Sequence, residues 1–265
     1  VDLETPANQA LFELREKLKT FLGRDAQSFD QEKANADWPI IEACEQAINS
    51  AEPQSSKMAQ ELWGHLIGAL DQVASKTKWH KTDPRWATVR RLLLRGSQDP
   101  IPSASDYPEE KEDGFIGWGW PAPRVDAAQG LPFVVDRTGS ADEEIAAALR
   151  ALVRDPTWPV RFNAVTRLAV LHKAAPQLMW ELIDSVIEAE TRYSVLDACL
   201  GALNYLWGVA GDKVMARVRR IAAKAKHAPA GAIPHFMKRQ ISTNFFEKLD
   251  SKSSAAKVND AGRGK

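Results

Sequence analysis

Histidine, cysteine and serine are the residue types from which metal sites and nucleophilic centres are most often built. This chain of 265 residues has five histidines and two cysteines, and neither H-E-x-x-H nor C-x-x-C spacing occurs among them. His65 and His172 lie in apolar stretches with helical spacing, where we expect packed or surface side chains rather than ligands. The sequence therefore predicts no metal and no cofactor.

A motif for a nucleophile or a phosphate loop is also absent. G-x-S-x-G does not occur, and no pair of carboxylates stands out from the predicted helix surfaces. The glycines of GFIGWGW, at 114–120, lack the G-K-[ST] ending of a phosphate loop and follow no clear strand. We therefore predict no catalytic residues and a protein that is not an enzyme. An enzyme whose residues come from separate helices would escape such a search.

The same stretch carries three large aromatic side chains, Phe115, Trp118 and Trp120. They form either a loop that presents aromatic rings to a partner or a loop whose rings fold back over the end of the helices. Exposed tryptophan costs free energy in water, so the second interpretation is favoured.

A row of basic residues follows helical spacing in the segment 212–227. Its members stand at i, i+4, i+7 and i+11 and share one helix face, opposite an apolar face: Lys213, Arg217, Arg220 and Lys224. Such a row could contact the phosphates of a nucleic acid. It is also typical of a solvated outer face with cations near a helix carboxyl end, which we favour.

Overall charge points to no polyanionic partner, because 35 basic residues balance 35 acidic ones. No run approaches the roughly 20 apolar residues of a membrane-spanning helix. Cys44 and Cys199 lie far apart in apolar helical patterns, which favours free thiols and a cytoplasmic location. The chain begins without Met and ends in a polar stretch, so we expect a region of a larger protein.

Helical spacing dominates the organisation of the chain. Helices are predicted over 5–23, 39–50, 56–75 and 84–96. The segment 96–120, dense in Pro, Gly, Ser and acid, is predicted to be a long functional loop or a boundary. It divides the chain into a helical region, a loop, a repeat region and a polar tail, at 1–95, 96–120, 121–249 and 250–265. Strand composition occurs only at 131–135, where Pro132 argues against a central strand, so the fold class is all-α.

One sequence unit recurs. Shifting DPTWPVRFNAVTRL, at 155–168, forward by 35 residues aligns Asp155 with Glu190, and shifting it back by 37 aligns Arg161 with Arg124. An apolar helical stripe before or after each copy, at a similar interval, predicts three helix pairs, so the structure should be stabilised by stacking of the pairs. The acidic residue is placed to cap the second helix of its pair.

The pattern D-P-x-W-P-V-R-x-x-A-x-x-x-L resembles the second helix of a HEAT repeat, over about 121–227. Asp155 and Arg161 stand where that family places an acid–arginine pair that ladders between repeats, and Trp158 is interpreted as a packing anchor. In the next copy Leu196 replaces the arginine and breaks the ladder, and in the preceding copy Pro132 is expected to interrupt the helix. The resemblance implies a right-handed α-solenoid of stacked antiparallel helix pairs.

The connector, the segment APRVDAAQGL and the D-P-x-W-x-V-R helix together also resemble helical regions of large bacterial multidomain proteins. Many of those couple an NTPase or effector domain to a helical sensor, often in antiviral defence against phage. We therefore expect a scaffold or sensor region that binds a protein partner or other domains of its parent protein. The concave face of the second helices or the 96–120 loop would carry the contacts. The alternative is a nucleic-acid-binding solenoid that uses the basic helix 212–227.

Overall fold

The computed structural model describes residues 6–22, 31–51, 57–108, 119 and 121–225. Within them the all-α prediction is confirmed, because helices and turns account for the chain and no strand occurs. The helices are α1 (Pro6–Leu22), α2 (Gln31–Ala36), α3 (Trp38–Ser50), α4 (Lys57–Lys76), α5 (Arg85–Gly96), α6 (Pro123–Thr138), α7 (Glu143–Leu152), α8 (Trp158–Arg167), α9 (Pro176–Ala189) and α10 (Tyr193–Ala225), with 3-10 turns η1 (Ala104–Asp106) and η2 (Leu168–His172).

Helix α10 consists of two helical parts. Ala210 has φ −147° and ψ 46°, which lie outside the helical region and bend the chain. We call 193–209 the first half and 211–225 the second half. The predicted tail 250–265, and the part of the predicted repeat region that spans 226–249, lie outside the described residues.

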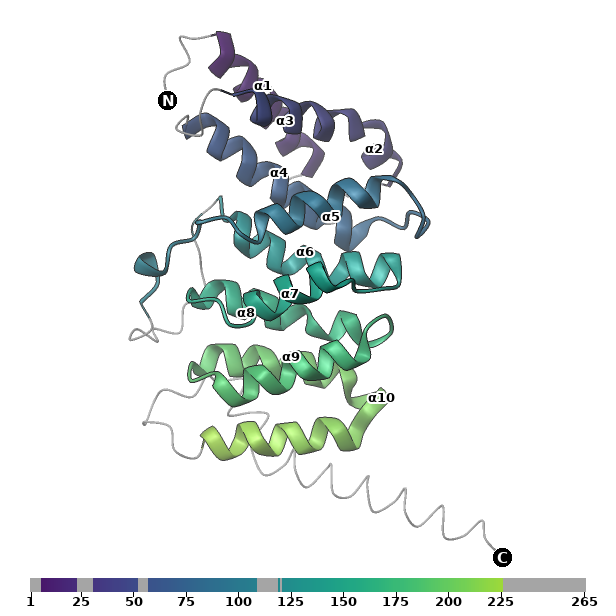
Figure 1. Cartoon of the computed structure of the whole chain (residues 1–265), viewed down its shortest axis with the longest axis vertical. Helices are drawn as coiled ribbons and strands as arrows, with labels where there is room; N and C mark the ends of the chain where they lie inside the picture. The colour runs from purple at the N-terminus through teal and green to yellow at the C-terminus, as the bar shows by residue number, and fades with distance from the viewer. Residues whose placement is uncertain (1–5, 23–30, 52–56, 109–118, 120, 226–265) are drawn as a thin grey trace, which may run out of the picture.

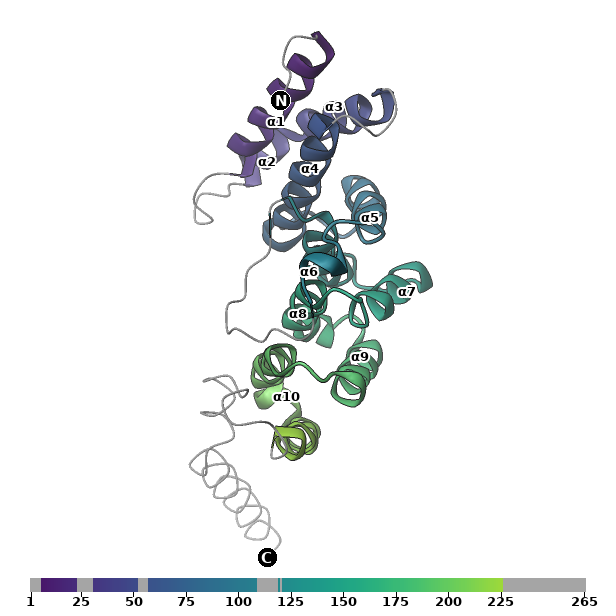
Figure 2. The ribbon, with the colours of Figure 1, turned by 90° about the vertical axis from the view of Figure 1, so that its left-hand side faces the viewer.

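The helices stack in two layers along the long axis of the molecule (Figures 1 and 2). One layer holds α1, α4, α6, α8 and the first half of α10, and the other holds α3, α5, α7 and α9. The second half of α10 packs against α9 at the carboxyl end of the stack. One apolar cluster runs from Leu11 to Ile221 across the segment 96–120, so the helices on both sides of that segment share a core.

Two glycines lie where α4 packs closely against α6 and the residues just before it. A Cβ at Gly130 would lie 3.2 Å from the Cα of Asp71 and 2.9 Å from a methyl carbon of Leu93. A Cβ at Gly64 would lie 2.0 Å from the Cβ of Pro121. Helix α6 packs against α4, α5 and α8, and most of its residues are buried.

The prediction that Pro132 interrupts its helix is wrong, because α6 continues from Pro123 to Thr138 through it. A proline inside a helix removes one backbone hydrogen bond and costs about 3 kcal/mol. Leu131 and Val134 beside it are fully buried, so packing on several sides offsets that cost. The helix ends at Gly139, whose φ of 83° favours glycine.

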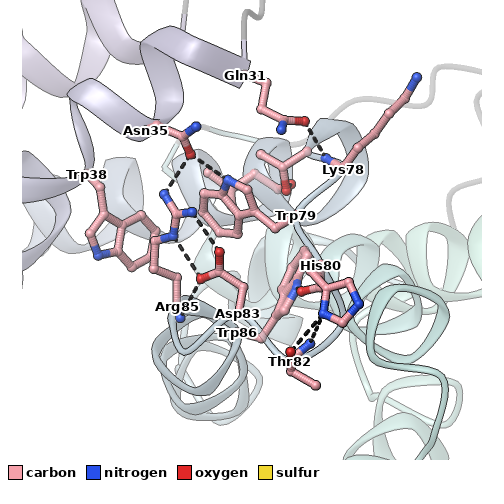
Figure 3. Close-up of polar contacts among 12 residues, drawn as sticks. Gln31, Asn35, Trp38, Lys78, Trp79, His80, Thr82, Asp83, Arg85 and Trp86 are labelled. Carbon is pink, nitrogen blue, oxygen red and sulfur yellow. Dashed lines mark hydrogen bonds and ion pairs between the residues drawn. The ribbon is translucent and has the colours of Figure 1, made fainter.

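Three tryptophans join α3 to the turn before α5 (Figure 3). The ring of Trp79 makes edge contacts with those of Trp38 and Trp86, each at a centroid distance of 5.3 Å. Asn35 Oδ1 accepts from Trp79 Nε1 at 2.7 Å and from Arg85 Nη1 at 2.6 Å, and the Arg85 guanidinium lies 3.9 Å from the Trp79 centroid. This buried cluster fixes α2 and α3 to the rest of the stack.

Candidate functional site

The repeated stretch at 155–168 forms part of the scaffold. The prediction that Asp155 caps the helix is wrong, because Asp155 accepts no N–H from α8, which begins at Trp158. Its Oδ1 instead accepts the N–H of Thr157, the residue just before that helix, at 2.7 Å. Its Oδ2 forms an ion pair with Nε of Arg124, on α6, at 2.9 Å. The acidic residue therefore ties the start of one unit to the helix of the unit before it.

Arg161 extends this connection to the next unit. Its Nε forms an ion pair with Glu190 Oε2 at 2.7 Å, and its Nη1 donates to the carbonyl of Asp155 at 2.8 Å. Glu190 also accepts the N–H of Arg192 at 2.8 Å. A chain of polar contacts thus links α6, α8 and the start of α10, and at the next position that aligns with Arg161 stands apolar Leu196.

Trp158 joins the long loop to the stack. Its ring contacts Tyr107 edge-on at 6.2 Å, and the Arg192 guanidinium lies 4.3 Å from its centroid. Arg124 donates to the carbonyls of Asp99 and Pro102. The loop therefore lies along one edge of the stack (Figure 1). Its predicted partner-binding rings, those of Phe115, Trp118 and Trp120, lie outside the described residues.

The basic row contacts α9 with three of its four members. Asp184 accepts from Arg217 Nη2 and from Arg220 Nη1, each at 2.5 Å. Lys224 Nζ donates to the carbonyls of Glu188 and Glu190 at 2.8 and 2.9 Å, at the carboxyl end of α9. Lys213 is exposed. The row therefore holds the second half of α10 against α9.

The thiols and the first histidine are poorly suited to catalysis. Burial raises the pKa of both Cys44 and Cys199 to about 12, so they are neutral thiols and weak nucleophiles. Burial also lowers the pKa of His65 to about 4. In the described part of the chain, no three His, Cys, Asp or Glu side chains come together as metal ligands. None of the helices described is long and apolar enough to cross a membrane.

Two carboxyl groups are buried where α4 meets α6. Burial raises the pKa of Asp71 to about 7. Burial, and then the charge of Asp71, raise the pKa of Asp126 well above its usual value. One turn after Asp126, Gly130 touches the backbone of Asp71, so both carboxyls share this helix contact.

Another surface extends over α6, α8 and the first half of α10, on the side away from α7 and α9 (Figure 2). Positions 129, 166 and 201 correspond under the 37- and 35-residue shifts, as do 133 and 205, and all are exposed or half-buried. We call this the α6–α8–α10 face. From the repeat shifts, the i, i+4 helical spacing and the contacts of Arg167 with Phe133 and Gln129, we assign to it the exposed or half-buried residues Gln129, Phe133, Phe162, Thr166, Arg167, Asp197, Gly201, Tyr205 and Val209.

Side-chain contacts between neighbouring units hold the polar residues of this face in place. Gln129 Nε2 donates to Asn163 Oδ1 at 2.9 Å. The Arg167 guanidinium lies 5.7 Å from the Phe133 centroid. At the carboxyl end Tyr205 is 80% exposed and neighbouring Val209 is 70% exposed, the two large hydrophobic side chains that stand open to water in the described residues. This face could have been predicted from the sequence by applying the 35- and 37-residue shifts to the solvent-facing positions of each unit.

In its described residues the protein is therefore an all-helical stack of two layers, with one partly exposed face formed by α6, α8 and the first half of α10. Comparisons of the chain with protein-family models, curated proteins and solved structures found no match.

Proposed function

We propose that the chain is a non-catalytic protein-interaction region of a larger bacterial protein, folded as a HEAT-like right-handed α-solenoid of antiparallel helix pairs. The 35- to 37-residue recurrence supports this, as do the polar contacts of Arg124, Asp155, Arg161 and Glu190 between successive units. Stacked units of this kind create extended binding surfaces, because each unit contacts only its neighbours.

The observation that carries the proposal is the exposure of Tyr205 and Val209 at one end of the α6–α8–α10 face. Tyrosine, phenylalanine and arginine are enriched at protein interfaces, where a few of them supply most of the binding free energy. The face also offers Phe133 and Phe162, both half-buried, and the guanidinium of Arg167. A partner protein that covers this face would remove the exposed apolar side chains from water.

Site-specific crosslinking in lysate of the source cell tests the proposal. A photo-reactive amino acid at position 205 should capture the same partner that the wild-type chain retains in a pull-down. Tyr205→Asp combined with Val209→Asp should abolish that retention. Arg150→Glu is the matched control because Arg150 belongs to α7, a helix of the other layer (Figure 2), and this variant should retain the partner. Equal retention by the aspartate variant and the wild type would contradict the proposal.

Nucleic-acid binding by the basic row is less well supported, because Arg217 and Arg220 share the carboxylate of Asp184 and Lys224 binds α9 carbonyls. Phosphate contacts would have to compete with these interactions. Binding of duplex DNA that weakens steeply with salt, and is lost in Lys213→Glu with Arg217→Glu, would favour this alternative.

A further inference from the structure

A cavity of about 600 Å³ lies at the edge of the stack from which the 97–108 segment emerges. The carboxyl ends of α3 and α5, the first turns of α4 and the 98–100 turn surround it. Its volume falls within the range of small-ligand pockets. It lies apart from the α6–α8–α10 face, and it combines an aromatic wall with polar groups from Asn49, Gln98 and Asp99.

Two neighbours hold the indole of Trp63 in place at this cavity. Its Nε1–H donates to Asp99 Oδ2 at 2.8 Å, and Asp99 Oδ1 accepts the N–H of Ile101 at 2.8 Å. The Arg95 guanidinium lies 4.5 Å from the Trp63 centroid. Since the indole N–H is already engaged and Trp63 is 8% exposed, the ring offers a ligand only a small apolar surface.

Arg95 brings a positive charge to the cavity. Its Nη1 donates to Asn49 Oδ1 at 3.0 Å, and no carboxylate in the described residues forms an ion pair with it, although its charge acts on the nearby Glu45 carboxylate. One turn earlier on α5, Arg91 does form such a pair, with Glu45. Arg95 is therefore oriented by an amide and an indole, while most of its N–H groups are left for a ligand.

We propose that this cavity binds a short peptide segment that bears a carboxylate. The carboxylate accepts two parallel N–H groups from Arg95, a geometry that matches a planar guanidinium. The adjoining main chain and apolar side-chain carbons lie against Trp63, and the Gln98 amide is available for a peptide group. The carboxylate comes from an acidic side chain or from a chain terminus, which share this chemistry.

The charges around the cavity favour a carboxylate over a phosphate. Among the described lining residues, Arg95 carries the positive charge and Asp99 a negative charge. These two charges cancel, so a singly charged carboxylate is repelled less by Asp99 than a phosphate dianion would be. The proposal does not rest on partner binding by the α6–α8–α10 face, and the two are measured separately.

The test uses the full chain, labelled with ¹⁵N, and follows the Trp63 indole and Arg95 Nε–H resonances, assigned with Trp63→Phe and Arg95→Gln. The probes are two libraries of four-residue peptides, one with a fixed glutamate and blocked termini, the other with a free carboxyl terminus. The same libraries with glutamine or a terminal amide serve as neutral probes. Carboxylate probes should shift both resonances, and the library that shifts them more identifies the source of the carboxylate.

Arg95→Gln should weaken binding of the selected peptide about tenfold or more, because it removes charge-assisted hydrogen bonds. Arg91→Gln is the matched control, one turn away on the same helix, and should leave the affinity unchanged. Circular dichroism establishes that both variants are folded. Equal shifts by neutral probes, larger shifts by inorganic phosphate, no shift at millimolar peptide, or unchanged affinity in Arg95→Gln would each overturn the proposal.

Discussion

Arg161 and Glu190 form an ion pair across two stacked units, with 2.7 Å between Nε and Oε2 and side chains only 11% and 5% exposed. The pair lies 29 residues apart in the chain and bridges α8 to the start of α10. Because water is largely excluded, the attraction between the two charges is weakly screened. The contact therefore fixes the position of one unit on the next.

We predict that Arg161→Met lowers the free energy of unfolding by about 3 kcal/mol, because it leaves the Glu190 carboxylate buried without its partner. Urea denaturation measures the change. Arg150→Met is the control, since the Arg150–Glu181 pair also joins neighbouring helices but its side chains are 40% and 52% exposed. This control should remain close to wild type, and similar losses in both variants would contradict a special role for the buried pair.

The helices were predictable because their signal is local. Leu62, Leu66 and Leu70 follow one helix face in the sequence, and all three are fully buried in α4. The separate apolar stripes of the 190–206 unit and of 212–227 predict a break between two helices, and the bend at Ala210 lies there. The continuation of α6 through Pro132 was not predictable, because it depends on packing against neighbouring helices, which intrinsic helix propensity does not describe.

We predict that Gly130→Ala lowers the free energy of unfolding by about 1–3 kcal/mol, because its Cβ would press on Leu93 and on the backbone of Asp71. Gly201→Ala is the matched control, because Gly201 is also in a helix and its added Cβ would meet nothing within 4 Å. This variant should raise the free energy of unfolding by up to about 1 kcal/mol through helix propensity. Thermal unfolding of both variants measures the difference, and a stabilised Gly130→Ala would refute the close approach of α4 and α6.

The candidate surfaces were less predictable than the helices. The sequence aligns Asp155 with Glu190, but the partner of Arg161 depends on how far one unit is displaced from the next. The pattern of the basic row predicts a solvated face, because helical spacing alone cannot show that Asp184 on α9 accepts from two of its arginines. The exposure of Tyr205 likewise depends on which side of the helix is covered.

We predict that Trp79→Ala lowers the free energy of unfolding by about 3–5 kcal/mol. The change removes both edge contacts, to Trp38 and Trp86, and the hydrogen bond to Asn35. Hydrogen exchange should locate the loss: amides of α2 and α3 should exchange faster, while those of α9, at the other end of the stack, keep their protection. Uniform loss of protection across the described helices would contradict a local role for the cluster.

The buried carboxyls at the α4–α6 contact predict a stability that falls as pH rises. Burial raises the pKa of Asp71 from 3.8 to about 7, so the folded protein retains a proton that the unfolded chain releases near pH 4. The free energy of unfolding should therefore decrease between about pH 4 and pH 7. Asp71→Asn and Asp126→Asn should each raise the free energy of unfolding at about pH 8 and change it little at about pH 4, as measured by chemical denaturation at both values.

Asp142→Asn is the control and should change the free energy of unfolding in the opposite direction. The hydrogen bond from Arg90 lowers the pKa of Asp142, so losing it should destabilise the protein at neutral pH. Destabilisation by Asp126→Asn at about pH 8 would show that its carboxylate is charged and stabilising in the folded protein.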